Sequence, residues 1–289
     1  MELRLAKNAG FCSGVRNAVT LAESAASAAG ITGRNVWTLG ELIHNPQELA
    51  RLCGMGIKIA NAVEDVPQGD TLIIRSHGVE PYVFGQCGAR GINVIDATCR
   101  YVKRMHGIAA EASRKQPIVI VGSAKHPEVT GTAGWCAGEV FIVADADEAA
   151  KLSAMDEAAV IAQTTIAPEL FDKVVEALRI RVTNLTVFDT ICNVTAKRQE
   201  EAVELAKWAD AMIVVGGANS SNTKQLAQTC EKYCSCVYYL SGADEIKEAD
   251  AGIIKDKAKV GVVSGASTPD WVLSEVAEEI SERQLFRKD

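Results

Sequence analysis

The chain has 289 residues, of which 48% are hydrophobic and 23% charged, as expected for a soluble globular protein with room for two or three domains. Its formal net charge of -7 argues against a broad nucleic-acid-binding surface, which would need clustered lysine and arginine. We therefore expect no nucleic acid partner. An anionic ligand would have to be held by local donors.

No apolar run approaches the ~20 residues of a membrane span, and residues 1–7 lack the apolar core of a signal peptide. We therefore expect no membrane partner and a cytoplasmic location, where thiols stay reduced. The nine cysteines are odd in number and widely spread, which does not suggest a disulfide framework. Some of them are expected to be metal ligands or catalytic groups.

An internal repeat organises the chain, because three segments share the order strand, short turn, cysteine and helix. The cysteines of this repeat, about ninety residues apart, are Cys12, Cys99 and Cys192. The predicted strands before them are 3–6, 94–98 and 187–191, and the predicted helices after them are 14–28, 102–113 and 196–207.

Further apolar strands recur in the same phase. Strands at 36–39, 118–121 and 212–215 precede His44, His126 and Ser220, and strands beginning at 72, 160 and 260 run into polar residues and a proline. Apolar strands alternating with helices are typical of buried parallel sheets in α/β units, whose ligands bind at the carboxyl ends of the strands.

We therefore predict an α/β protein of three domains, at residues 1–97, 98–191 and 192–289, related by a pseudo-threefold axis around one central cavity. The alternative is that the three units are strung out and resemble one another by chance.

Three cysteines from three domains suit an iron–sulfur cluster. A [4Fe–4S] cluster normally takes four thiolates, so three leave one iron open to bind a substrate oxygen as a Lewis acid. Zinc is the competing interpretation, but structural zinc sites usually show close cysteine pairs, which these three lack. The local group Cys230, Cys234 and Cys236 fits no standard zinc spacing, and we interpret it as buried thiols.

Three of the four histidines, His44, His77 and His126, follow apolar strands at the predicted cavity edge. Each alone would more often be a satisfied structural residue, but three at equivalent places suit a diphosphate, which needs convergent N–H and O–H donors. The fourth, His106, lies outside the repeat and is expected at the surface.

Glu128 stands two residues after His126. In a dry site the pKa of such a carboxyl group rises enough to deliver a proton at neutral pH. The alternative is a glutamate on a loop rim or in the first turn of a helix.

The loop 216–223 follows a strand and precedes a helix expected to start near Lys224. Its glycines allow close backbone approach, and a helix N-terminus favours phosphate. It matches neither a Walker loop nor a dinucleotide fingerprint. Ser220, Ser221 and Asn222 are alternatively helix-capping residues, a role compatible with touching phosphate. Residues 264–269 end the last strand in the same manner.

At these positions the chain resembles the LytB family of 4-hydroxy-3-methylbut-2-enyl diphosphate reductases. The motifs that carry the resemblance span the whole chain and occur at residues 10–15, 42–45, 75–79, 96–99, 126–129, 163–165, 189–192, 219–222 and 265–269.

The resemblance implies a three-domain trefoil around one [4Fe–4S] cluster per chain, held by Cys12, Cys99 and Cys192 with one iron open. It implies that a small allylic diphosphate is reductively dehydroxylated to isopentenyl and dimethylallyl diphosphates, the last step of the non-mevalonate isoprenoid pathway. An electron-donor protein such as ferredoxin or flavodoxin would supply the electrons.

The resemblance also assigns the polar residues. The residues implied to hold the diphosphate are His44, His77, Ser220, Asn222 and Ser267, with Ser221 alongside. The residues implied at the reacting end are His126, Glu128 and Thr164, with Glu128 governing proton delivery. The sequence leaves open whether the hydroxyl of Thr164 or that of Thr165 points towards the substrate.

The chain departs from the family pattern at Arg100, where proline is usual, at Val194, where alanine is usual, and at Ser264, where threonine is common. Arg100 places a cation near the implied cluster, where it would affect the reduction potential of that cluster.

The nearest rival enzyme is quinolinate synthase, which also has three α/β units around a three-cysteine cluster. A rival of another class is a metal-free or zinc-loaded protein that binds a phosphorylated metabolite.

Overall fold

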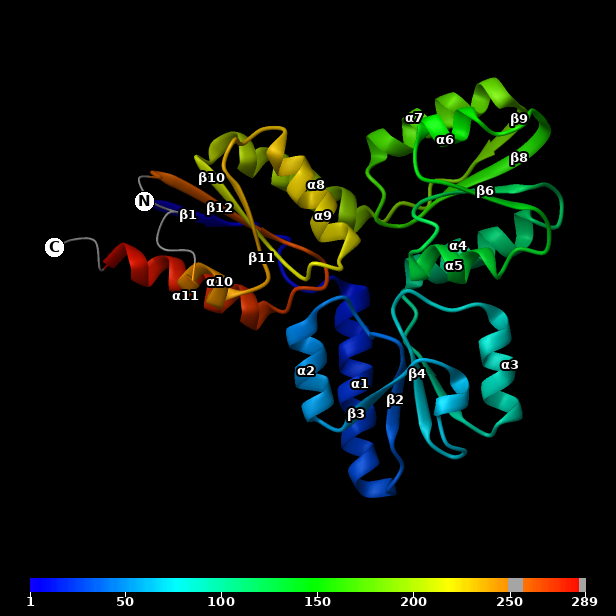
Figure 1. The fold of residues 1–289 in the computed structure, drawn as a ribbon, viewed down its shortest axis with the longest axis horizontal. Coiled ribbons are helices and arrows are strands. Elements are labelled where there is room, and N and C mark those ends of the chain that lie inside the picture. The colour runs from blue at the N-terminus through cyan, green and yellow to red at the C-terminus, as the bar shows by residue number, and fades with distance from the viewer. Residues whose placement is uncertain (249–256, 286–289) are drawn as a thin grey trace. The chain divides into compact units, whose positions relative to one another are not determined.

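The computed structural model describes residues 1–248 and 257–285 (Figure 1). The chain divides into two compact units, each described here by itself. Unit 1 consists of Met1–Ser13, His44–Glu48 and Asn193–Asp289, and unit 2 consists of Gly14–Ile43 and Leu49–Cys192. Among the described residues, no helix has both the length and the apolar character that a membrane span requires.

Unit 2 contains two four-stranded parallel sheets. The first has the strand order β3-β2-β4-β5 and the second the order β7-β6-β8-β9. The strands of the first are β2 (Val36–Leu39), β3 (Ile57–Ala60), β4 (Thr71–Ile74) and β5 (Asn93–Asp96). Those of the second are β6 (Ile118–Val121), β7 (Val140–Val143), β8 (Met155–Ala162) and β9 (Val182–Val187).

Helices connect the strands of unit 2, as parallel pairing requires. They are α1 (Ser13–Thr32), α2 (Pro46–Gly54), the 3-10 turn η1 (Val63–Asp65), α3 (Pro81–Ala89), α4 (Arg100–Ala112), α5 (Pro127–Ala133), α6 (Ala146–Ala150) and α7 (Pro168–Arg181). The start of α1 and the start of α2 belong to unit 1. In α1 the buried residues Val15, Ala18, Val19, Ala22 and Ala25 recur three or four positions apart, so one face packs inward.

Unit 1 contains the third sheet, with the order β1-β12-β10-β11. Its strands are β1 (Glu2–Leu5), β10 (Ala211–Val215), β11 (Val237–Leu240) and β12 (Lys259–Ser264), and its helices are α8 (Asn193–Trp208), α9 (Ser221–Glu231), α10 (Ala243–Glu248) and α11 (Asp270–Leu285). Figure 1 shows β1, in blue, beside β12, in orange; the two strands are paired in parallel from Glu2 with Lys259 to Leu5 with Val262.

The three sheets share one strand order. Read from the edge, β3-β2-β4-β5, β7-β6-β8-β9 and β11-β10-β12-β1 correspond strand for strand, and every pair is parallel. The α/β class with three parallel sheets is therefore confirmed.

The place of β1 differs from the sequence-based domain 1–97. β1 corresponds to β5 and β9, which close the other two sheets, and its pairing with β12 puts it in the C-terminal sheet. Each repeat thus starts at the helix after its cysteine, and the strand that completes the last repeat comes from the start of the chain.

Two strands inside the sheets are completely buried. All residues of β6 and β10 are buried, which explains why their sequences are apolar without interruption.

Candidate functional site

All three repeat cysteines are tied to the neighbouring strand by the same backbone hydrogen bond. The N–H of Cys99 donates to Ser76 O at 3.0 Å, that of Cys192 to Thr164 O at 2.9 Å, and that of Cys12 to Ala266 O at 3.1 Å. Each acceptor lies two residues beyond the end of its strand, β4, β8 or β12. All three cysteines are half-buried, form no disulfide bond and lie at the carboxyl edge of their sheets.

Unit 2 brings Glu128 and Thr164 together. Glu128 lies in the first turn of α5 and is 3% exposed. Its Oε1 accepts the backbone N–H of Thr164 at 2.6 Å, and its Oε2 accepts the Thr164 hydroxyl at 2.9 Å. Thr165 instead accepts a hydrogen bond from Gln163 Nε2 at 2.9 Å, so Thr164 is the threonine that contacts the carboxyl group.

The environment of Glu128 changes its acidity. Burial raises the pKa of its carboxyl group to about 7, and the two hydrogen bonds from Thr164 act in the opposite direction. A carboxyl group with this pKa exchanges a proton near neutral pH, which suits a general acid. Glu128 is thus a first-turn helix residue, as the alternative interpretation held, but a buried one with a perturbed pKa.

His126 and His77 lie beside this pair in unit 2. His126 caps α5, since its Nδ1 accepts the backbone N–H of Glu128 at 3.2 Å. An accepting Nδ1 carries no proton, so the neutral ring bears its proton on Nε2. The ring of His77 meets that of His126 edge-on, with 5.5 Å between centroids. Contacts within unit 2 therefore link six residues that follow β4, β5, β6, β8 and β9, namely Cys99, Cys192, His77, His126, Glu128 and Thr164.

In unit 1, the loop after β10 forms the N-terminus of α9. Ser220 Oγ accepts the N–H of Thr223 at 3.3 Å, so α9 starts at Ser221 and not near Lys224 as expected from sequence. Asn222 is 5% exposed, and within the described part of the chain both polar atoms of its amide lack a hydrogen-bond partner. A buried amide without partners is costly unless a ligand satisfies it.

The same unit places His44 and Ser267 next to this loop. Ser267 is 7% exposed, and its Oγ donates to His44 O at 3.1 Å. A Cβ on Gly217 would stand 2.6 Å from the same carbonyl oxygen, so only glycine permits this approach. Unit 1 therefore carries Cys12, His44, Ser220, Ser221, Asn222 and Ser267 at the carboxyl edge of its sheet.

The cysteines outside the repeat have a different environment. Cys230 and Cys234 are buried in the core of unit 1, and burial raises the pKa of Cys230 to about 12. Such a thiol stays protonated and packs as a small apolar group, whereas a metal ligand must be a thiolate.

His106 is buried and not at the surface as expected. It is 4% exposed and stacks on Trp135, with 5.2 Å between ring centroids. Burial lowers its pKa to about 4, so the ring is neutral near pH 7. The signal was present in the sequence: Val102, Met105, His106 and Ala109 form the buried stripe of α4, with His106 one residue from a core methionine.

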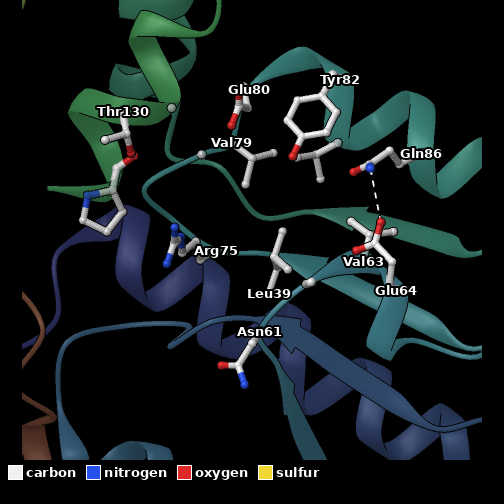
Figure 2. Close-up of a pocket in the computed structure, with 15 residues that line it drawn as sticks. Leu39, Asn61, Val63, Glu64, Arg75, Val79, Glu80, Tyr82, Gln86 and Thr130 are labelled. Atoms are coloured by element: carbon white, nitrogen blue, oxygen red, sulfur yellow. Dashed lines mark hydrogen bonds between the residues drawn. The ribbon is translucent and has the colours of Figure 1, made fainter. Parts of the chain in front are cut away.

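A separate cavity of about 220 Å³ lies between η1, α3 and α5 within unit 2. Figure 2 shows Arg75, Glu80 and Tyr82 around it, with Gln86 bonded to Glu64 across one side. Its lining includes Gly78 and Thr130 but none of the predicted site residues. It is therefore distinct from the predicted site, although Gly78 and Pro127 in its lining directly follow His77 and His126 in the chain.

Known proteins resemble the chain over nearly its full length. The family described as "LytB protein" matches residues 3–281. A 4-hydroxy-3-methylbut-2-enyl diphosphate reductase of Geobacter sulfurreducens is 42% identical, with 98% of each chain covered. One of Caldanaerobacter subterraneus is 40% identical, covering 97% of this chain and 96% of the relative.

Two solved structures share the fold. One is a structure of (E)-4-hydroxy-3-methyl-but-2-enyl diphosphate reductase, the terminal enzyme of the non-mevalonate pathway, at 38% identity and a TM-score of 0.71, covering 97% of this chain and 99% of that one. The other is the E-1-hydroxy-2-methyl-but-2-enyl-4-diphosphate reductase of Plasmodium falciparum, at 25% identity and a TM-score of 0.88, covering 96% and 86%.

Proposed function

Because the chain belongs to the LytB protein family, we propose that it is a 4-hydroxy-3-methylbut-2-enyl diphosphate reductase of the non-mevalonate isoprenoid pathway. The substrate takes up two electrons and two protons, loses its hydroxyl group as water and becomes isopentenyl or dimethylallyl diphosphate. The observation that supports this reaction most strongly is the buried Glu128 carboxyl group, bonded to Thr164 and with a pKa of about 7.

Cys12, Cys99 and Cys192 are the protein ligands of one [4Fe–4S] cluster in this proposal. The three cysteines suit the cluster as ligands, because they are half-buried, form no disulfide bond and are held by equivalent backbone hydrogen bonds. When bound, the cluster supplies electrons and an open iron that acts as a Lewis acid towards the hydroxyl oxygen. A protein such as ferredoxin or flavodoxin delivers the two electrons.

The donors of unit 1 hold the diphosphate end. Asn222 offers a buried amide without a partner among the described residues, and the N-terminus of α9 offers backbone N–H groups to an anion. The Ser220, Ser221 and Ser267 hydroxyls and the His44 ring complete the donors of unit 1, and the assignment adds the His77 ring of unit 2. Binding energy from this end, remote from the bond that breaks, orients the allylic end.

Proton delivery falls to Glu128. With a pKa of about 7 the carboxyl group is partly protonated at neutral pH, and its hydrogen bond with the Thr164 hydroxyl gives the proton a route from the buried carboxyl group to a neighbouring group. His126, whose Nδ1 accepts from the Glu128 backbone, presents the opposite edge of its ring as a donor.

The test is anaerobic purification and reconstitution of the full chain. We expect a brown protein with iron and sulfide, whose visible spectrum changes on addition of the allylic diphosphate, and which reduces this substrate with a chemical electron donor. A spectrum that responds only to the dicarboxylates used by quinolinate synthase would contradict the proposal. So would a colourless protein that still binds phosphorylated metabolites.

A further inference from the structure

The segment that leads from β1 to Cys12 is the longest of the three that connect a strand to a repeat cysteine. Residues 6–11 lie between β1 and Cys12, whereas only 97–98 separate β5 from Cys99 and 188–191 separate β9 from Cys192. A longer segment loses more conformational freedom when it is ordered, so it needs more contacts to hold one shape.

Arg198 of α8 supplies two of these contacts. Its side chain is buried, with the residue 5% exposed. Nη2 donates to Gly10 O at 2.6 Å and Nη1 to Ser264 O at 3.1 Å. The first carbonyl lies two residues before Cys12 and the second two residues before Ala266, whose carbonyl accepts the Cys12 N–H. One rigid guanidinium therefore joins both segments that hold Cys12.

Glu201, three residues further along the same face of α8, holds the start of the segment. Its Oε1 accepts the N–H of Lys7 at 2.5 Å, and its Oε2 accepts the N–H and the side-chain amide of Asn8 at 2.9 and 3.0 Å. These are charge-assisted bonds, among the stronger classes of hydrogen bond in proteins.

Gly10 completes the arrangement. Its N–H donates to Ser264 Oγ at 2.8 Å, and its φ of +84° is a conformation that favours glycine. A side chain at this position would run into the carboxylate of Asp270. The backbone conformation just before Cys12 is thus fixed by two sets of hydrogen bonds, one to Ser264 at the end of β12 and one to Arg198 of α8.

We propose that Arg198 and Glu201 are positioning residues that hold Cys12 ready to bind the cluster, an inference that rests on the proposed role of Cys12 as a ligand. Groups that orient a metal ligand without touching the metal typically change metal affinity about 10–100-fold when they are removed. A preordered Cys12 segment lowers the entropy lost when the thiolate is fixed on iron.

The experiment compares Arg198→Met with Lys197→Met in the full chain, reconstituted without oxygen. Lys197 is an exposed neighbour on the same helix, so its variant removes the same charge without touching the Cys12 segment. The readout is the rate at which visible absorbance and bound iron are lost to a chelator. We expect about 10–100-fold faster loss from Arg198→Met and a nearly unchanged rate from Lys197→Met. Arg198→Lys, which cannot span both carbonyls as a fork, should fall between them.

A second variant separates a folding defect from a ligand effect. Glu201 is partly exposed, so Glu201→Ala should fold, as judged by circular dichroism of the cluster-free chain, and should still lose iron faster than wild type. If the wild-type chain holds iron while Glu201→Ala and any folded Arg198→Met retain it equally well, the inference is overturned and the proposed function stands. A wild-type chain that binds no iron would overturn both.

Discussion

Thr164 contacts Glu128 twice, donating its backbone N–H to one carboxyl oxygen at 2.6 Å and its hydroxyl to the other at 2.9 Å. Both bonds favour the charged carboxylate, while burial favours the neutral acid, and burial is the larger effect. The balance leaves the carboxyl group with a pKa of about 7, so at neutral pH it gains or loses a proton at little free-energy cost.

Replacing Glu128 by glutamine removes the acid but keeps the size and one acceptor oxygen. We expect turnover to fall by roughly 10²–10⁴-fold, the range for loss of a general acid. Substrate affinity should change little, because the proposed diphosphate donors lie on other elements. Steady-state reduction with a chemical donor, combined with titration of the substrate-induced spectral change, measures both. Near-normal turnover would show that Glu128 is only a structural residue of the first turn of α5.

The pH dependence follows from the same group. The protonated form is the donor, so the proton-delivery step should slow as pH rises through about 7. Stability should show the same sign, because a carboxyl group whose pKa is raised on folding binds more protons in the native state than in the unfolded state. Native stability from this group therefore declines between the ordinary pKa of a glutamate and about 7. Chemical denaturation of the cluster-free chain across this range should show a decline that Glu128→Gln lacks.

Thr164 and Thr165 form a matched pair for mutagenesis. Thr164→Val removes the hydroxyl that lowers the pKa of Glu128, so the pH at which turnover falls should move upward. Because the same hydroxyl is the proposed route of the proton, the maximum turnover should decrease. Thr165→Val removes a hydroxyl bonded to Gln163 and should leave that pH profile in place. Rate profiles of both variants test the assignment. An equal shift in both would mean that the Thr164 hydroxyl has no special part in proton transfer.

Asn222 should matter for binding and not for the chemical step. Its amide atoms are buried without a partner among the described residues, and a hydrogen bond to a charged group contributes about 1.5–3 kcal/mol. Asn222→Ala should therefore raise KM by roughly 10–100-fold with a smaller change in kcat. Isothermal titration with the diphosphate substrate checks the binding part directly. Unchanged affinity would remove Asn222 from the proposed diphosphate site.

Much of this organisation is predictable from sequence because repetition is visible there. The unbroken apolar strands, the cysteine after each closing strand and the polar turns recur in one register, and the three parallel sheets confirm the expected fold class. The partner of β1 was not predictable in the same way. A four-residue strand carries no mark of which edge it joins, and its pairing with β12 depends on contacts more than 250 residues apart.

Side-chain geometry marks a second limit. Sequence alone left Thr164 and Thr165 equivalent, because both follow the same strand and only the backbone path at the end of β8 decides which one meets Glu128. The expected surface position of His106 was wrong: it depended on the residue lying outside the repeat, whereas the apolar stripe of α4 around it determines its burial. Asn222 could be named as a donor, but its lack of partners is visible only in three dimensions.

The central claim is that Cys12, Cys99 and Cys192 hold one cluster, and iron content per chain tests it most directly. Serine at any one of these three positions should abolish a stable cluster after anaerobic reconstitution. Serine at Cys230, Cys234 or Cys236 should leave iron content intact, because those thiols belong to or border the core of unit 1. Equal loss of iron from both sets, or full retention of iron in a Cys12, Cys99 or Cys192 variant, would contradict the account.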